Sequence, residues 1–201
     1  MFILSPIELQ YKDWCLYFAL KVTLESNFRV QMSQDIKFSV HQLYEISKMV
    51  KQQFPKQTSA HRLLIKLKDT GLVSEDDYKA KSMFGVSYYL KKVYTYKLDS
   101  LNDIRHALCM LRECGPLLAV IYISQNYDKC TKTGEVYKYD SNFPIGNEKK
   151  PITHAITVIS FALENGPFLH CQDSQGLAHG EGGYLKVDVT SIKELYAFTI
   201  K

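Results

Sequence analysis

The sequence predicts an α+β fold in which a mainly helical part comes first and a mainly β part follows. Up to about residue 85, apolar residues recur at the three-to-four-residue spacing of helices,. After that point, runs of β-branched and aromatic residues predominate, as they do in strands. With 201 residues, 46% of them hydrophobic, the chain is long enough to bury one large core or two packed subdomains.

A buried helix is predicted over residues 14–27, because apolar side chains lie on most sides of its helical wheel,. Asp13 is its expected N-cap, since a carboxylate there accepts bonds from the first backbone N–H groups. Cys15 then falls in the first turn, where the helix dipole lowers the pKa of a thiol and activates the sulfur as a nucleophile. The alternative is a thiol that serves only as a small core side chain.

Three more helices are predicted from their start and stop signals. The second begins at Ser39, which forms a capping-box pattern with Gln42,. The third begins at Ser59 and ends at Gly71, because glycine readily takes the left-handed conformation that stops a helix. The fourth covers residues 100–114, where helical spacing returns within the β part,.

Strands are predicted where β-branched and aromatic residues run together or alternate. The run 117–124 is continuously apolar and is expected to be a buried strand. Glu164-Asn165-Gly166 is a hairpin turn signal, which makes the strands on either side antiparallel neighbours. The predicted strands of this antiparallel sheet region are 86–96, 117–124, 154–163, 167–172, 183–189 and 196–200.

The charge pattern and the apolar runs argue against several kinds of partner. The net charge is only +4, with basic residues scattered among acidic ones, so no nucleic acid is expected. No apolar run approaches the roughly 20 residues of a membrane-spanning helix, so no membrane is expected either. Residues 1–6 lack the basic region of a signal peptide,. The expected location is therefore cytoplasmic.

The cysteines favour free thiols, because an odd number without dense regular spacing does not form a disulfide framework. His106, Cys109 and Cys114 lie near one another in sequence, but structural zinc sites need four ligands at tighter paired spacing. Neither a metal nor another cofactor is therefore predicted. The five cysteines are Cys15, Cys109, Cys114, Cys130 and Cys171.

A series of motifs runs in order along nearly the whole chain. It opens with Cys15-Leu16-Tyr17-Phe18-Ala19, and His154 lies 139 positions after Cys15. The stretches 38–43, 71–78, 115–121 and 180–187 follow the same order, the last of them reading Gly-Glu-Gly-Gly-Tyr-Leu-Lys-Val. Together they resemble the papain-like cysteine proteases, whose central helix opens with Cys-Trp-Ala-Phe-Ala and whose histidine follows roughly 130 to 150 residues later.

The resemblance implies one papain-like catalytic domain over residues 1–201. It would have a helical lobe over about 10–85, an antiparallel β-barrel-like lobe over about 86–201, and a cleft between them. Cys15 would be the nucleophile and His154 the acid and base, acting on a peptide or protein substrate in a monomer. No propeptide precedes the matching stretches, so the chain is interpreted as a divergent member that lacks both signal peptide and propeptide.

Three positions near the implied site depart from the family pattern. Asp173 replaces the Asn that orients the histidine, and its charge should raise the pKa of His154, which favours the ion pair but weakens the proton donor. Gln175 replaces the Trp that shields this bond, so water is expected to reach the pair. Gln10 is the candidate oxyanion donor, although it lies one position closer to Cys15 than the family's Gln.

Two functions of different classes remain open. The first is a cysteine peptidase that hydrolyses peptide amide bonds through Cys15, His154 and Asp173 and a thioester intermediate, with Gln10 as oxyanion donor. The second is a catalytically impaired homologue that keeps the cleft to bind a peptide or protein. Rapid alkylation of Cys15 below the ordinary thiol pKa would favour the first.

Overall fold

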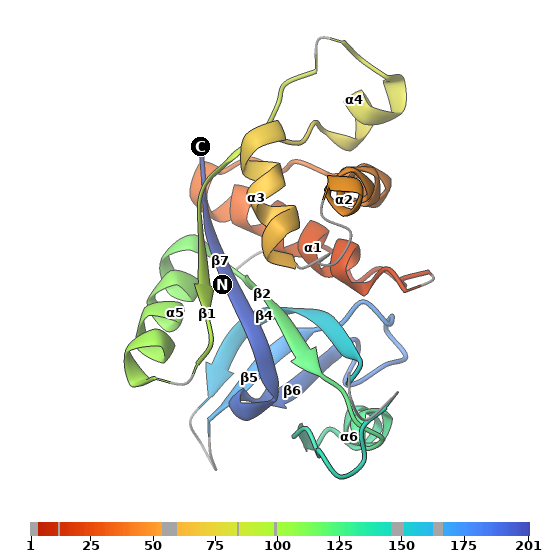
Figure 1. Ribbon diagram of the computed structural model, residues 1–201, viewed down its shortest axis with the longest axis vertical. Helices are drawn as coiled ribbons and strands as arrows, with labels where there is room; N and C mark the ends of the chain where they lie inside the picture. Colours follow the sequence, from red (N-terminus) through yellow and green to blue (C-terminus); the bar gives the residue numbers. More distant parts are fainter. Residues whose placement is uncertain are drawn as a thin grey trace.

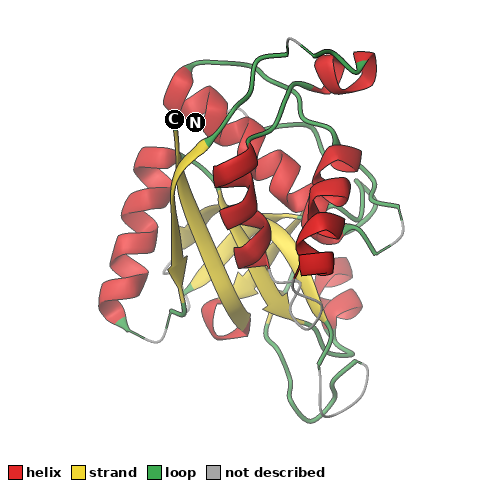
Figure 2. Cartoon of the chain, turned by 45° about the horizontal axis from the view of Figure 1, so that its top comes forward, coloured by secondary structure: helices red, strands yellow, loops and turns green. Residues whose placement is uncertain are grey.

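The computed structural model describes residues 4–11, 13–53, 60–83, 85–98, 100–145, 151–162 and 167–201. Over these residues, a twisted seven-stranded sheet packs against helices (Figures 1 and 2), so the predicted α+β class is confirmed. The helices are α1 (Cys15–Met32), α2 (Val40–Gln53), α3 (Ala60–Thr70), α4 (Glu75–Ala80), α5 (Leu101–Cys114) and α6 (Tyr127–Thr133). The strands are β1 (Leu90–Tyr96), β2 (Leu117–Tyr122), β3 (Val136–Tyr137), β4 (Thr153–Ala162), β5 (Phe168–Gln172), β6 (Tyr184–Asp188) and β7 (Ile192–Ile200).

The sheet runs in the order β1-β7-β2-β4-β5-β6-β3. Neighbouring strands are antiparallel, except that β3 pairs with β6 in parallel. The expectation of a purely antiparallel sheet is therefore wrong at this edge, because the chain leaving α6 runs in the same direction as β6. β4 and β5 are antiparallel as predicted, with Ala162 opposite Phe168. The predicted turn Glu164-Asn165-Gly166 lies outside the described residues.

Alternation along the central strands separates two hydrophobic cores on opposite faces of the sheet. On β2, Leu118 and Val120 pack with α1, α2 and α3, whereas Leu117 and Ala119 pack with α5. Figure 2 shows the helices on the two sides of the strands. The first core contains strand residues from beyond position 86 as well as helix residues, so this core crosses the predicted boundary between the lobes near residue 85. The division of the chain into two lobes stays a prediction.

The start of α1 differs from the prediction. Trp14 is the N-cap residue and makes no side-chain capping bond, so the assignment of Asp13 as N-cap is wrong. The Trp14 carbonyl accepts the N–H groups of Tyr17 and Phe18, and its indole stacks on Tyr44 with ring centroids 4.4 Å apart. Aromatic packing against α2 therefore fixes this end of the helix in place of a polar cap.

The signals for the second and third helices are partly confirmed. Ser39 directly precedes α2 and its carbonyl accepts the Leu43 N–H, but the Oε1 of Gln42 has no hydrogen-bond partner among the described residues. The reciprocal half of the predicted capping box is therefore absent. α3 ends at Thr70, and Gly71 follows with a φ of 68°, as the stop signal predicts. Ser59, the predicted start, lies outside the described residues.

α1 and β7 are longer than predicted, and three short elements are not predicted at all. α1 continues five residues beyond Asn27 and ends at Met32, where Ser33 takes the left-handed conformation and its N–H donates to the Arg29 carbonyl. β7 begins at Ile192 rather than Tyr196, because residues 192–195 already pair with β2. α4, α6 and β3 were not predicted, because such short elements show no clear periodicity.

None of the described helices is long and apolar enough to span a membrane.

Candidate active site

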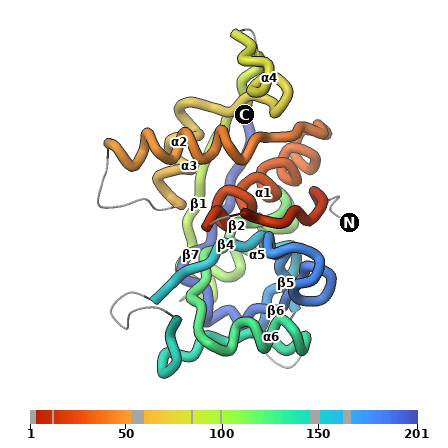
Figure 3. The backbone as a smooth tube through the Cα atoms, turned by 90° about the vertical axis from the view of Figure 1, so that its right-hand side faces the viewer, coloured from red at the N-terminus to blue at the C-terminus, as the bar shows by residue number. Residues whose placement is uncertain are grey.

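Cys15 is the first residue of α1, which packs against β4 (Figure 3). The first N–H groups of a helix have no partners within the helix, so they and the dipole favour negative charge on a sulfur placed there. The half-buried thiol lines a pocket of about 160 Å³. Residues of α3, β2, β4 and β7 complete its wall, among them His154, Lys193 and Glu194.

β4 brings His154 to the same pocket. This second residue of β4 pairs with Ile121 of β2 and is 5% exposed. Its Nε2 lies 2.8 Å from Oδ1 of Asp173, and its imidazole also makes a hydrogen bond with the thiol of Cys15. Because Asp173 engages Nε2, Nδ1 is the nitrogen that remains for the sulfur. The structure therefore places Cys15, His154 and Asp173 in one row.

The electrostatics of the row favour a thiolate and an imidazolium. Burial would raise the pKa of Cys15, but the hydrogen bond and charge of His154 and the N–H groups of Ala155 and Leu16 outweigh it and lower that pKa. Burial would likewise lower the pKa of His154, but the bonds and charges of Asp173 and Cys15 raise it to about 10. At a pH between the pKa of Cys15 and that of His154, the sulfur has lost its proton and the imidazole has kept its own, so the two form an ion pair.

Asp173 follows β5 and is held from several sides. Its backbone N–H donates to the carbonyl of Gly183 at 2.9 Å. Its Oδ1 accepts from His154 and, at 3.3 Å, from the N–H of Gln175, while its Oδ2 accepts from the hydroxyl of Tyr127 at 2.8 Å. Burial would raise the pKa of this carboxyl, but the imidazole and then the Tyr127 hydroxyl outweigh it and lower the pKa.

The expectation that water reaches this pair is wrong. Asp173 is only 1% exposed, even though Gln175 takes the place of a shielding tryptophan. Two other rings supply the cover: the ring of Tyr127 lies 5.7 Å from that of His154, and His179 lies 5.8 Å from Tyr127. The cover is therefore supplied by α6 and by the loop that follows Asp173, and the His154–Asp173 bond lies in a water-poor environment.

Tyr127 and His179 were not among the predicted site residues. Tyr127 begins α6, which has no periodic pattern to announce it. His179 directly precedes the Gly-Glu-Gly-Gly-Tyr stretch. The resembled family often has an aromatic residue near the cleft at this position, and this is the one signal in the sequence that indicates a site residue here.

Gln10 is placed by the segment that follows Asp173. Its backbone N–H donates to the Ser174 carbonyl at 2.7 Å, and its Oε1 accepts from the Ser174 hydroxyl at 2.5 Å. The neighbouring Leu9 forms an isolated β-bridge with Gln175. These contacts use the side-chain oxygen of Gln10, and its amide nitrogen has no hydrogen-bond partner among the described residues. That nitrogen is the end an oxyanion donor must use. No hydrogen bond joins Gln10 to Cys15 among the described residues.

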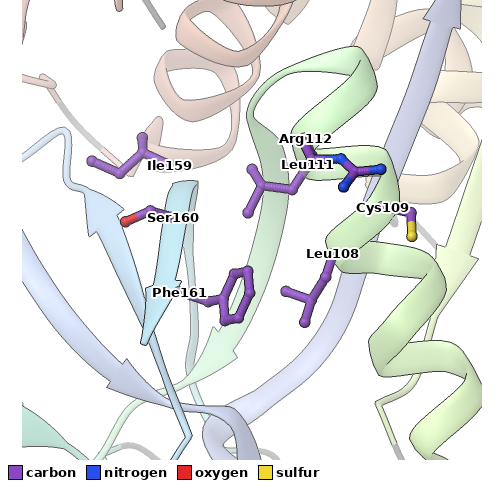
Figure 4. A pocket seen from close by; sticks show the side chains of 7 residues that line it. All are labelled: Leu108, Cys109, Leu111, Arg112, Ile159, Ser160 and Phe161. Atoms are coloured by element: carbon purple, nitrogen blue, oxygen red, sulfur yellow. The ribbon is translucent and has the colours of Figure 1, made fainter. Parts of the chain in front are cut away.

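A larger pocket, of about 370 Å³, lies between α5 and the far part of β4 (Figure 4). Leu108, Leu111 and Phe161 make it mainly apolar, and Cys109 and Arg112 stand among its lining residues. Neither a histidine nor a carboxylate lines this pocket, so its cysteine has no base there. The smaller pocket at Cys15 is therefore the candidate active site.

The histidine and cysteines near one another in sequence, considered above as zinc ligands, make other contacts. His106 contacts the hydroxyl of Tyr96 at 3.3 Å, and the sulfur of Cys114 contacts that of Met110. Among the described residues, no three His, Cys, Asp or Glu side chains gather into a metal site. All five cysteines are free thiols.

Solved structures resemble this chain over almost its whole length. A procathepsin B from Trypanosoma congolense aligns with a TM-score of 0.72 at 15% identity, covering 98% of this chain and 72% of that one. Procathepsin L 3 from the larval midgut of Tenebrio molitor gives 0.69 at 17% identity, covering 97% and 66%. A structure from work on the mite allergens Blo t 1 and Der p 1 gives 0.67 at 19% identity, covering 98% and 67%.

These likenesses concern the fold. The neighbours are papain-like, so the papain-like fold implied by the motifs is confirmed. No protein-family model matches the sequence, and no curated protein matches it. This chain spans about two thirds to three quarters of the lengths of the three solved chains.

Proposed function

We propose that this chain, which has the papain-like fold, is a cysteine peptidase that hydrolyses peptide amide bonds. One observation carries the proposal: a thiol with a lowered pKa at a helix N-terminus shares a pocket with a buried imidazole that is itself bonded to a carboxylate. A nucleophile, its acid and base, and the group that orients the base are the parts that acyl transfer requires. The site residues in these roles are Cys15, His154 and Asp173.

The first half of the reaction forms a thioester. The Cys15 thiolate attacks the carbonyl carbon of the substrate, and the carbonyl electrons move to oxygen. The N–H of Cys15 and the amide nitrogen of Gln10 are the proposed donors to that oxyanion. As the carbonyl re-forms, the C–N bond breaks, and the imidazolium of His154 gives its proton to the leaving amine.

The second half restores the enzyme. Neutral His154 takes a proton from water, whose oxygen attacks the thioester carbon. The C–S bond then breaks, and the carboxylic acid product leaves with the sulfur returned to the thiolate beside an imidazolium. Asp173 keeps its charge throughout and stabilises the imidazolium form.

The charge of Asp173 also supports the second candidate, an impaired homologue that binds peptides. A histidine with its pKa raised to about 10 holds its proton firmly, and a firmly held proton is given slowly to a leaving amine. Such a protein would keep the pocket but turn over slowly or not at all. The two candidates therefore differ in the acid step and not in the architecture of the site.

A direct experiment separates the two candidates. The protein, its Cys15→Ala variant and a Cys109→Ala control are incubated with a mixture of unstructured peptides, and new peptide ends are read by mass spectrometry. We expect cleavage by the protein and by the control, whose substitution lies in the other pocket, but not by Cys15→Ala. If no peptide is cut, while Cys15→Ala still binds peptides from the mixture, the binding function replaces the peptidase.

The proposal includes the conditions of action. Oxidation of the Cys15 thiol would stop the reaction, because the thiolate is the nucleophile. We therefore propose that the protein works in a reducing compartment such as the cytoplasm. We also propose that it works as a monomer, because one chain supplies Cys15, His154 and Asp173. Peptide cleavage that survives prolonged exposure to oxidised glutathione, or a dimer in analytical ultracentrifugation at assay concentration, contradicts the respective part of this proposal.

A further inference from the structure

Asp173 needs more hydrogen-bond donors than an orienting asparagine would. Its side chain is completely buried, and a buried carboxylate is costly unless donors satisfy both oxygens. His154 and the N–H of Gln175 serve Oδ1. Without a donor at Oδ2, the carboxylate could turn and present either oxygen to the imidazole.

Tyr127 supplies the donor at Oδ2. Its hydroxyl lies 2.8 Å from this oxygen, and its side chain is among the largest fully buried ones. Burial and the neighbouring Asp173 raise its pKa well above the ordinary value, so the phenol keeps its proton and donates across the whole working range of pH. The bond is therefore permanent and not itself titratable near neutrality.

The phenol of Tyr127 is itself held firmly. The ring of Tyr137 packs against it edge-on, with centroids 4.9 Å apart. The Tyr137 hydroxyl in turn accepts the Ser124 N–H at 2.9 Å and donates to the Tyr122 carbonyl at 3.0 Å. A rigid donor fixes an acceptor better than a mobile one, because less side-chain freedom is lost in the bond.

His179 closes the remaining side of the carboxylate. Its Nε2 lies 3.7 Å from Oδ2 of Asp173, beyond hydrogen-bond distance, and has no hydrogen-bond partner among the described residues. Its ring therefore covers the carboxylate without taking the place of the Tyr127 hydroxyl. Tyr127 thus remains the only side-chain donor to Oδ2 among the described residues.

We propose that Tyr127 is a positioning residue, whose hydroxyl fixes the Asp173 carboxylate so that Oδ1 stays aimed at Nε2 of His154. The role rests on the proposed peptidase function. It acts through Asp173 and not on the substrate, so it should affect kcat and leave KM nearly unchanged. It should also affect the thiolate of Cys15, because the imidazolium that stabilises this thiolate is held by Asp173.

The test compares Tyr127→Phe with the matched control Tyr96→Phe. Each substitution removes the hydroxyl of a buried tyrosine and keeps the ring, but only the first removes a bond to Asp173, since the Tyr96 hydroxyl contacts His106. We expect Tyr127→Phe to move the acid limb of Cys15 alkylation by iodoacetamide to higher pH and to lower kcat roughly ten-fold. Tyr96→Phe should leave both unchanged, even where it lowers the melting temperature as much.

A double-mutant cycle with Asp173→Ala distinguishes action through the carboxylate from general loosening of the fold. In the Asp173→Ala background, Tyr127→Phe should shift the alkylation profile no further. An unchanged or acid-shifted profile for Tyr127→Phe, the same profile for both tyrosine variants, or additive effects in the cycle overturn the proposal. Because alkylation needs no substrate, failure to cleave peptides would reject the proposed function without deciding the role of Tyr127.

Discussion

The Nε2 of His154 and the Oδ1 of Asp173 lie 2.8 Å apart, between side chains that are almost entirely removed from solvent. In such surroundings a charge pair interacts more strongly than in water, because little solvent screens it. The pair therefore controls the protonation state of the whole row that ends at Cys15, and the pH behaviour of the protein follows from it.

Peptide cleavage should follow a bell-shaped pH profile. The acid limb reports protonation of Cys15, whose pKa is lowered, so it should lie below the roughly 8.5 of an ordinary thiol. The alkaline limb reports loss of the proton from His154, and it should lie near the raised value of about 10. Values of kcat/KM from initial rates between pH 4 and 11 measure both limbs. An alkaline limb near pH 6.5, the pKa of an ordinary histidine, contradicts the proposed role of Asp173.

Replacing Asp173 by asparagine should move the alkaline limb to lower pH. The carboxylate raises the pKa of His154, and a neutral amide removes that charge while still accepting a hydrogen bond. The imidazolium of Asp173→Asn should also give its proton more readily. Its kcat at neutral pH should then equal or exceed that of the native chain, whereas Asp173→Ala, with no acceptor, should lose activity. An alkaline limb that stays in place in Asp173→Asn counts against this account.

Replacing Gln10 by alanine tests the proposed oxyanion donor. If its amide nitrogen reaches the oxyanion, Gln10→Ala should lower kcat by about 10² to 10³ with little change in KM. Alkylation of Cys15 should not change, because the thiolate does not depend on this amide. Gln34→Ala, at an exposed position, is the control. Equal activity of the two alanine variants would remove Gln10 from the mechanism.

Replacing Glu25 by alanine should strongly destabilise the fold. This residue of α1 is fully buried, accepts the Phe38 N–H at 3.0 Å and the Ser5 hydroxyl, and lies 3.4 Å from Lys37. Glu25→Ala leaves these groups without their acceptor, which should lower the free energy of unfolding by about 3 kcal/mol.

Urea denaturation measures the effect, with Glu113→Ala as the comparison. Glu113 pairs with Arg112 on the surface, where loss of an ion pair costs about 1 kcal/mol or less. Similar losses in the two variants would show that the buried carboxylate is not what holds α1 to its neighbours.

Local patterns in the sequence were enough to locate the principal helices and most strands. Gly71 stops α3 as predicted, because such a signal acts through the backbone conformation of a few residues. The same reasoning placed Asp13 at a cap where aromatic packing acts instead, and it missed α6, whose seven residues have no period long enough to read.

The motifs and their spacing were also enough to imply the fold and to identify Cys15, His154 and Asp173 as candidate catalytic residues. They could not say how far Asp173 is from water or what satisfies its second oxygen. That depends on Tyr127, 46 residues earlier in the chain, and on a loop that brings His179 beside it. Periodicity and caps are local properties, whereas the burial of a charge is set by every segment that packs around it, so it emerges only when the chain is folded.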